Sequence, residues 1–340
     1  MDRIDHFGTL LMTAKLRKYK SRDFLRIRDF LTANYMAFKH PVNWDLVRWN
    51  YARYFCAPML GAWGLGVEEK KPPDTSGKSS REAIRLWENS IGIWENESGG
   101  IAGVVCPDEF VPWHPAFGQA FLQRHPDYEH LMPEMLAYAE ETFTGKGMTR
   151  IYVGEPDKSL QEAARERGFV RDEKSCANYM LYDLGDVPEA NLPNGYRFVS
   201  SDENNDLEKL REVRGLSFYH PDPDDWATVY SYKELQKAPD YRKELDIVVE
   251  RPDGKWVACT IAWFDSCNRM GTLEPVGAVQ LGMGREVVME GLRRLRDLGA
   301  LVAHMDAGLE YYEKIGFRKQ FPIFRWVKKC TELPSHEGCR

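Results

Sequence analysis

Apolar and polar positions follow the same order of patterns in both halves of the chain: helical spacing, alternation in hairpins, then strand and helix in turn. In the first half this predicts helices at 21–38 and 44–55, a hairpin at 91–105, a strand at 118–126, a helix at 130–143, a strand at 150–154, a helix at 159–169 and a strand at 178–184. In the second half it predicts a strand at 195–201, helices at 206–219 and 226–238, a hairpin at 245–264, a strand at 271–279, a helix at 285–299, a strand at 300–305, a helix at 307–317 and a strand at 323–329. Strands that alternate with helices in this way indicate a mixed sheet covered on both faces. We therefore predict a duplicated α/β protein.

The segment GDVPEANLPNG, at 185–195, separates the two sets of elements. It carries two prolines between flanking glycines, which is typical of a linker between domains. We predict a first domain at 1–187 and a second at 188–340. The endings RERGF and EKIGF hold the same place in the two halves, as expected for an internal repeat.

Composition narrows the class of protein. The 340 residues are 43% hydrophobic and 29% charged, which is ordinary for a globular protein. A net charge of −6 argues against nucleic acid as a partner, because polyanion binding needs clustered Lys and Arg. Seven scattered cysteines without a CxxC pair indicate free thiols, and no apolar run reaches the length of a membrane span. We expect a cytoplasmic protein without a membrane contact, and no His pair has the spacing of a metal site.

The run VQLGMGREVV joins a predicted strand to a predicted helix through Gly282 and Gly284. Backbone N–H groups can surround a phosphate only where no Cβ blocks the approach, and a helix N-terminus favours an anion. Arg285 in the first turn adds a positive charge. The alternative interpretation is a tight turn that only needs glycine.

Together with LEPVGAV before it and YYEKIGF after it, this run resembles the GNAT superfamily of acetyl-CoA-dependent N-acyltransferases. The similarity covers nearly all of the second half and, more faintly, the first, so that the whole chain resembles tandem GNAT proteins. It implies acetyl-CoA as co-substrate, with the pantetheine held where the fourth strand splays from the fifth at a bulge. The residues implied in binding it are Val276, Gly277, Ala278, Gln280, Leu281, Gly282, Met283, Gly284 and Arg285.

Two residues are candidates for proton transfer. Glu274 matches the glutamate that GNAT enzymes often place on the fourth strand, where it would take a proton from the amine; a carboxylate paired with a cation is the equal alternative. Pro275 beside it cannot donate a ladder hydrogen bond, which fits a bulge. Tyr312 matches the family tyrosine that protonates the departing thiolate. We interpret Tyr311 as a core aromatic.

The chain also departs from the family pattern. The loop before Gly282 is shorter, Gln280 lies one place too near the first glycine, and Met305 stands where an asparagine is usual. The first half has no glycine at the corresponding loop and no tyrosine equivalent to Tyr312. We interpret the first half as a degenerate copy that braces the second or walls its acceptor cleft.

These observations predict an N-acetyltransferase that acts by direct attack of a primary amine, which is carried by a small molecule or a peptide. The sequence leaves open whether the protein is a monomer or a homodimer. The alternative is a catalytically degenerate GNAT protein that acts as an acyl-CoA sensor or interaction module. A third hypothesis replaces the donor with a longer acyl-CoA. Acceptor selectivity resides in loops without a general motif, so that the sequence leaves the acceptor open.

Overall fold

The computed structural model describes residues 12–64, 72–110, 118–307 and 310–329. The chain divides into two compact units, each made of separate segments. Unit 1 comprises Met1–Asp45, Arg85–Ala177 and Pro322–Arg340, and unit 2 comprises Leu46–Ile84 and Asn178–Phe321. The sequence-based division at 187/188 differs from this one because residues 46–84 and 178–187 belong to unit 2, whereas residues 322–340 belong to unit 1. Two long strands, β6 (Val170–Asp183) and β12 (Arg318–Lys329), each have residues in both units.

Unit 1 is a mixed sheet with strand order β1-β2-β3-β4-β5-β12, ending on the first part of β6. Among the described strands β4 and β5 pair in parallel, whereas β1 with β2, β2 with β3, β3 with β4 and β5 with β12 pair antiparallel. The elements are β1 (Ala14–Lys18), α1 (Asp23–Asn34), β2 (Gly92–Asn96), β3 (Ile101–Cys106), β4 (Gln119–Arg124), η2 (Pro126–Leu131), α5 (Met132–Phe143), β5 (Met148–Gly154) and α6 (Lys158–Glu166).

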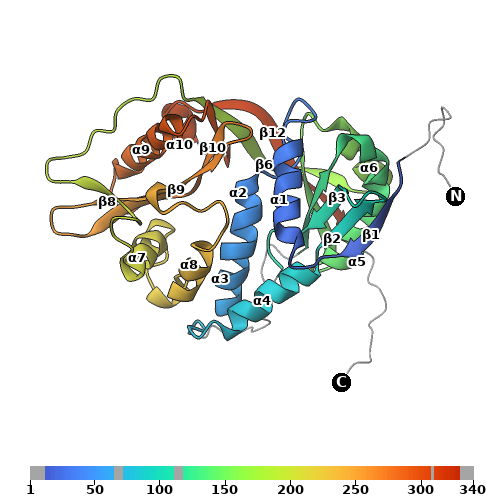
Figure 1. Ribbon diagram of the computed structural model, residues 1–340, viewed down its shortest axis with the longest axis horizontal. Coiled ribbons are helices and arrows are strands. Elements are labelled where there is room, and N and C mark those ends of the chain that lie inside the picture. Colours follow the sequence, from blue (N-terminus) through green and yellow to red (C-terminus); the bar gives the residue numbers. More distant parts are fainter. Residues whose placement is uncertain (1–11, 65–71, 111–117, 308–309, 330–340) are drawn as a thin grey trace. The chain divides into compact units, whose positions relative to one another are not determined.

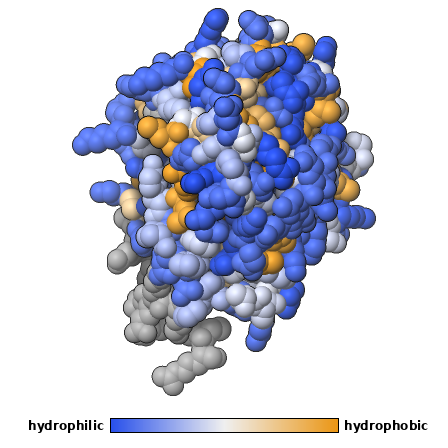
Figure 2. Space-filling view, turned by 90° about the vertical axis from the view of Figure 1, so that its left-hand side faces the viewer, coloured by the Kyte–Doolittle hydropathy of each residue, from blue (hydrophilic) through white to orange (hydrophobic). Residues whose placement is uncertain are grey.

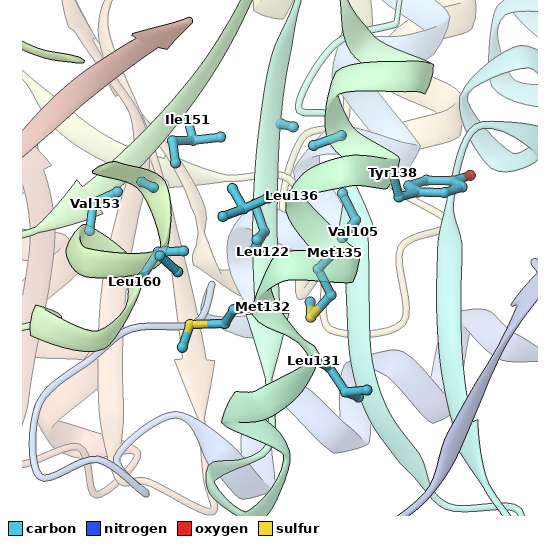
Figure 3. Close-up of a cluster of buried hydrophobic side chains, with 14 of the residues drawn as sticks. Val105, Leu122, Leu131, Met132, Met135, Leu136, Tyr138, Ile151, Val153 and Leu160 are labelled. Carbon is cyan, nitrogen blue, oxygen red and sulfur yellow. The ribbon is translucent and has the colours of Figure 1, made fainter. Parts of the chain in front are cut away.

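Helix α5 supplies the centre of the unit 1 core. Its buried residues Met132, Met135, Leu136 and Ala139 recur at the spacing of one helical face. Pro133 in the first turn suits a helix start, because the missing N–H has no helical partner there. Figure 3 shows this face of α5 against side chains of β3, β4, β5 and α6. The same apolar spacing that predicted the helix therefore positions it on the sheet.

The strands of unit 2 follow in the same strand order, β6-β11-β10-β9-β8-β7, from the latter part of β6 onward. Strands β10 and β11 pair in parallel, and β6 with β11, β10 with β9, β9 with β8 and β8 with β7 pair antiparallel. Its elements are α2 (Leu46–Tyr51), η1 (Ala52–Cys56), α3 (Ala57–Ala62), β7 (Arg197–Ser200), α7 (Leu207–Ser217), η3 (Pro223–Asp225), α8 (Val229–Leu235), η4 (Lys243–Leu245), β8 (Asp246–Glu250), β9 (Trp256–Asp265), β10 (Met270–Ala278), α9 (Met283–Asp297), β11 (Val302–Ala307) and α10 (Glu310–Lys314). Helix α4 (Lys78–Asn89) passes from unit 2 into unit 1.

Helices cover both faces of the unit 2 sheet (Figure 1). Two glycines allow α9 to lie close on one face: a Cβ at Gly271 would lie 2.4 Å from Leu295, and a Cβ at Gly291 would lie 2.8 Å from Leu273. On the opposite face, a Cβ at Gly277 would lie 2.5 Å from Ser217 of α7. The two units thus each confirm the predicted α/β architecture of a mixed sheet flanked by helices.

Two elements were not anticipated from the sequence. Strand β1 is short and its pattern AKLRK is mostly polar, so that only its pairing with β2 reveals it. Helix α4 lies between the predicted helix at 44–55 and the predicted hairpin at 91–105, where the sequence analysis placed no element. The predicted helix at 44–55 is real but continues through a π-helical turn, η1, into α3.

The face drawn in Figure 2 is mostly hydrophilic, with apolar side chains in small separate groups. Among the described residues, no helix has both the length and the apolar character required to cross a bilayer.

Candidate functional site

The unit 2 sheet opens into a fork between β10 and β11. These parallel strands pair over Met270–Thr272 with Val302–His304. Beyond it, β11 continues along β6 as far as Ala307, while β10 continues along β9 as far as Ala278. The sequence predicted a sheet opening beside Pro275, and the register confirms it.

A bulge in β10 sets the orientation of Glu274. The register against β9 shifts between Leu273 and Val276, and both of these residues pack on the α9 side of the sheet. Because successive side chains alternate between faces, Glu274 follows Leu273 onto the opposite face. The indole Nε1–H of Trp263 donates a hydrogen bond of 2.8 Å to the carbonyl oxygen of Glu274. The backbone of the carboxylate is therefore fixed at the mouth of the fork.

One edge of Val276, Gly277 and Ala278 pairs with Thr260, Cys259 and Ala258 of β9. The opposite edge runs along the fork, and within the described ranges β11 pairs with β6 at this level instead. Backbone groups on this edge are available to a bound molecule, which is the position expected for the pantetheine.

Gly282 is the residue before the first turn of α9. Its φ of 88° lies in the left-handed region, and among the described residues no atom beyond its own chain neighbours lies within 4 Å of the place of a Cβ. Gly284 follows in the first turn, where a Cβ would lie 3.3 Å from the hydroxyl of Tyr311. The N–H groups of this turn have no helical carbonyl before them, so that they and the helix dipole present a positive end to an anion.

The other predicted loop residues have different environments. Leu281 is fully exposed at 100%, whereas Met283 is buried in the first turn of α9. The side chain of Gln280 lies 3.2 Å from the hydroxyl of Tyr196, which ties the loop to the segment before β7. Arg285 pairs with Glu286 at 2.9 Å and remains half-buried at the helix start.

The two tyrosines of α10 have the opposite burial to that predicted. Tyr311, interpreted as a core aromatic, is 38% exposed, with its hydroxyl near Gly284. Tyr312 is the more buried one: it packs on the core of unit 2 and lies edge-on to Phe317 at 5.8 Å between ring centroids. The prediction for Tyr311 was wrong because the short α10 aims this ring at α9 rather than into the sheet.

The charge of Glu274 acts on Tyr312. Burial, and after it the negative charge of Glu274, raise the pKa of Tyr312 to about 12. Its phenol is therefore protonated at neutral pH and able to donate a hydrogen bond.

Three residues near Glu274 carried no signal in the sequence that singled them out. Burial and the charge of Glu274 raise the pKa of Tyr51 of α2 well above its usual value. Thr272 Oγ1 lies 2.7 Å from His304 Nε2 at the last paired position before the fork. Val47 and Tyr51 lie in the unit 2 core, whereas Trp44 precedes α2 and lies tilted against Phe121, with 4.6 Å between the ring centroids.

Unit 1 contains a corresponding fork with a different interior. Its parallel strands pair only at Gln119–Ala120 with Arg150–Ile151. Arg124 ends β4 and donates hydrogen bonds of 2.6 and 3.0 Å to Asp157, which precedes α6. Both side chains are buried, and no glycine opens the loop from 125 to 131. The two strand ends are thus bridged by the side chains of the protein itself.

The sequence also has an acidic segment at 219–226. It is mainly exposed, as expected of a solvated segment, and lies outside the site. Among the described residues no group of three or more His, Cys, Asp or Glu side chains is arranged to hold a metal ion.

The Gly282→Ala substitution should cost about 1–2 kcal/mol of unfolding free energy, because a left-handed φ is unfavourable for alanine. The sequence-based prediction of a phosphate site at this turn further implies weaker acetyl-CoA binding by this variant in a calorimetric titration. Gly254→Ala is the matched control, since that hairpin glycine has a φ of 80° and equally open surroundings. Equal loss of affinity in both variants would remove Gly282 from the phosphate site.

Comparison with known proteins places the fold. No family model matches the sequence, and no curated protein matches it closely. Among solved structures, a GCN5-related N-acetyltransferase from Sphaerobacter thermophilus superposes with a TM-score of 0.55 at 14% identity, covering 94% of this chain and 98% of the other.

Two further structures give the same result. A tandem GNAT protein from the clavulanic acid biosynthesis pathway has a TM-score of 0.51 at 11% identity, over 84% of this chain and 95% of the other. Saccharomyces cerevisiae N-myristoyltransferase with bound myristoyl-CoA has a TM-score of 0.52 at 10% identity, over 97% of this chain and 83% of the other. The chain therefore has the tandem GNAT fold, which confirms the predicted resemblance at the level of the fold.

Proposed function

We propose that this protein is an N-acetyltransferase whose fork in unit 2 binds acetyl-CoA and presents it to a primary amine. The features that support the proposal are the fork between β10 and β11, the effect of the Glu274 charge on Tyr312, and the left-handed Gly282 at the start of α9. The structural neighbours are acetyltransferases and acyltransferases, which supports acyl transfer as the general reaction.

In the proposed reaction the amine nitrogen attacks the thioester carbonyl carbon, and Glu274 accepts the proton that the nitrogen loses. The C–S bond then breaks, and the departing thiolate takes a proton from the hydroxyl of Tyr312. The two steps are coupled: when Glu274 becomes neutral, the charge that helps to raise the pKa of Tyr312 disappears. Tyr312 thus becomes more acidic at the stage at which it donates.

The α9 N-terminus would hold the pyrophosphate of acetyl-CoA. First-turn amides and the helix dipole favour phosphate oxygens, and Gly282 leaves room for them. The free edge of Val276–Ala278 would pair with the pantetheine amides and polarise the thioester carbonyl. An amine acceptor, small or peptidic, in a cytoplasmic setting completes the proposal; donor profiling with longer acyl-CoA molecules tests the alternative donor.

The experiment that tests the function is isothermal titration with acetyl-CoA, followed by thiol release across a panel of primary amines. Heat of binding together with amine-dependent thiol release supports an enzyme. Binding without turnover on any amine would favour the alternative, an acyl-CoA sensor. Absence of heat at millimolar ligand would remove both functions.

The titration should also give one acetyl-CoA per chain. The unit 1 fork is bridged by Arg124 and Asp157, whose buried charges would have to separate to admit a second molecule. A stoichiometry of two would show that unit 1 binds the cofactor as well.

A further inference from the structure

Unit 1 contains a hollow apart from its fork, where α6 ends and β6 begins. The hollow encloses about 360 Å³ and is lined by residues of one continuous segment and of β12: Arg165, Phe169, Val170, Arg171, Glu173 and Trp326. All of these residues belong to unit 1. A volume of this size lies within the range of pockets that hold small molecules, about 300–1,000 Å³.

Arg165 presents charged donors that a ligand can reach. The residue is exposed, and its guanidinium carbon lies 5.1 Å from the centroid of the Trp326 ring. Among the described residues its side chain makes one hydrogen bond, of 3.3 Å from Nη2 to Oε1 of Gln161, and no ion pair. A guanidinium that stacks on an indole keeps its plane fixed, while its N–H edge can bind a carboxylate through two parallel hydrogen bonds. The open donors of Arg165 therefore favour a carboxylate as ligand.

The other charges at the hollow already have partners. Arg171 donates a hydrogen bond of 2.6 Å from Nε to Glu173, and its Nη1 lies 3.1 Å from Glu155. Lys158 pairs with the same Glu155 at 2.9 Å. These two cations and two carboxylates balance each other, so that Arg165 is the cation in excess. An anionic ligand can bind Arg165 without breaking an existing ion pair.

The apolar part of the lining selects the rest of the ligand. Val170 is 70% exposed, although valine is usually buried, whereas Phe169 and Trp326 are 2% exposed each. An apolar group that covers Val170 removes this surface from water, which favours binding. A carboxylate joined to such a group matches both parts of the hollow.

We propose that this hollow binds a small carboxylate with an aromatic or branched apolar group, with the carboxylate on Arg165 and the apolar group against Val170. The site has no residue in common with the proposed acetyl-CoA site and requires no chemical step. Unit 1, whose fork is bridged by its own side chains, thus keeps a binding role that is independent of acetyl transfer.

The test is a calorimetric titration of the full-length protein with 3-phenylpropionate. Binding is expected with a Kd of about 1 mM or below, as for other ligands of this size. Two related compounds should bind at least about tenfold more weakly: 3-phenylpropanamide lacks the charge, and propionate lacks the ring. Acetyl-CoA is left out, so that the result does not depend on the proposed N-acetyltransferase function.

Arg165→Gln should weaken the binding of 3-phenylpropionate by about ten- to hundredfold, the range of hydrogen bonds from a charged donor. Val170→Thr replaces one methyl group by a hydroxyl of similar shape and should weaken it by about threefold. Arg22→Gln is the matched control, because Arg22 is also exposed in unit 1 but does not line the hollow. Its affinity should equal that of the wild type.

Three results would overturn the inference. The first is absence of heat with the wild type at about 10 mM 3-phenylpropionate, ten times the expected Kd. The second is equal affinity for 3-phenylpropionate and its amide, which would show that the charge of Arg165 is not used. The third is unchanged affinity in Arg165→Gln, or an equal loss in Arg22→Gln, which would place the ligand elsewhere.

Discussion

Tyr312→Phe is expected to lower kcat for acetyl transfer by about 10²- to 10⁴-fold, the usual contribution of a positioned general acid. The substitution removes one hydroxyl and keeps the ring that packs on the unit 2 core and on Phe317. Acetyl-CoA affinity should therefore change little. Stopped-flow or steady-state thiol release with a saturating amine measures the effect.

Tyr311→Phe is the matched control, because it removes the same atom from the neighbouring residue, whose hydroxyl lies near Gly284 rather than toward Glu274. It should leave kcat within a few-fold of the wild type. Because the pKa of Tyr312 is raised to about 12, the phenol stays protonated throughout the neutral range, and the wild-type rate should not fall there through its ionisation. Equal rates for Tyr312→Phe and wild type would contradict its role as the acid.

Asp157→Ser is expected to destabilise the protein by about 3–5 kcal/mol, the cost of leaving one partner of a buried ion pair alone. Serine still caps α6, where Asp157 accepts a hydrogen bond from the N–H of Leu160, so that the loss of charge is isolated from the loss of a cap. Arg124 would retain only Glu129, at 3.3 Å, as an acidic partner in the described part of unit 1. Urea unfolding measures the change.

The double variant Arg124→Met/Asp157→Ser should regain much of that loss, because neither charge is then left buried. If Asp157→Ser alone costs less than about 1 kcal/mol, as an exposed ion pair would, then the bridge does not hold the two strand ends together. The same result would weaken the expectation that unit 1 excludes acetyl-CoA.

Most elements were predictable because their signals are local. The helical spacing of Met132, Met135 and Leu136 and the glycine turns of the hairpins require no knowledge of the rest of the chain. Gly282 and Pro275 likewise marked the helix start and the irregular strand. Strand β1 escaped because five mostly polar residues have no pattern of their own and become a strand only by pairing with β2.

The composition of the site was harder to predict, because it depends on contacts between distant segments. Tyr51 precedes Glu274 by more than two hundred positions, yet the charge of Glu274 raises its pKa. The contrast between Tyr311 and Tyr312 depends on how α10 lies against α9, which periodicity in so short a helix cannot decide. The buried ion pair of Arg214 with Asp246 also has no sequence signature, since an arginine within a polar helix is normally expected to face water.

By itself, the sequence determined the duplicated α/β order and placed Gly282 and Gly284 at the start of α9, and its resemblance to the GNAT superfamily singled out Glu274 and Tyr312 as candidates for proton transfer. The tertiary structure alone decided that the chain divides into interleaved segments and that the fork of unit 1 is bridged by Arg124 and Asp157. It also decided that α2 lies in the same unit as Glu274. The physical reason is that local spacing and backbone preferences are written in neighbouring residues, whereas strand register, burial and charge pairing arise only when distant residues meet.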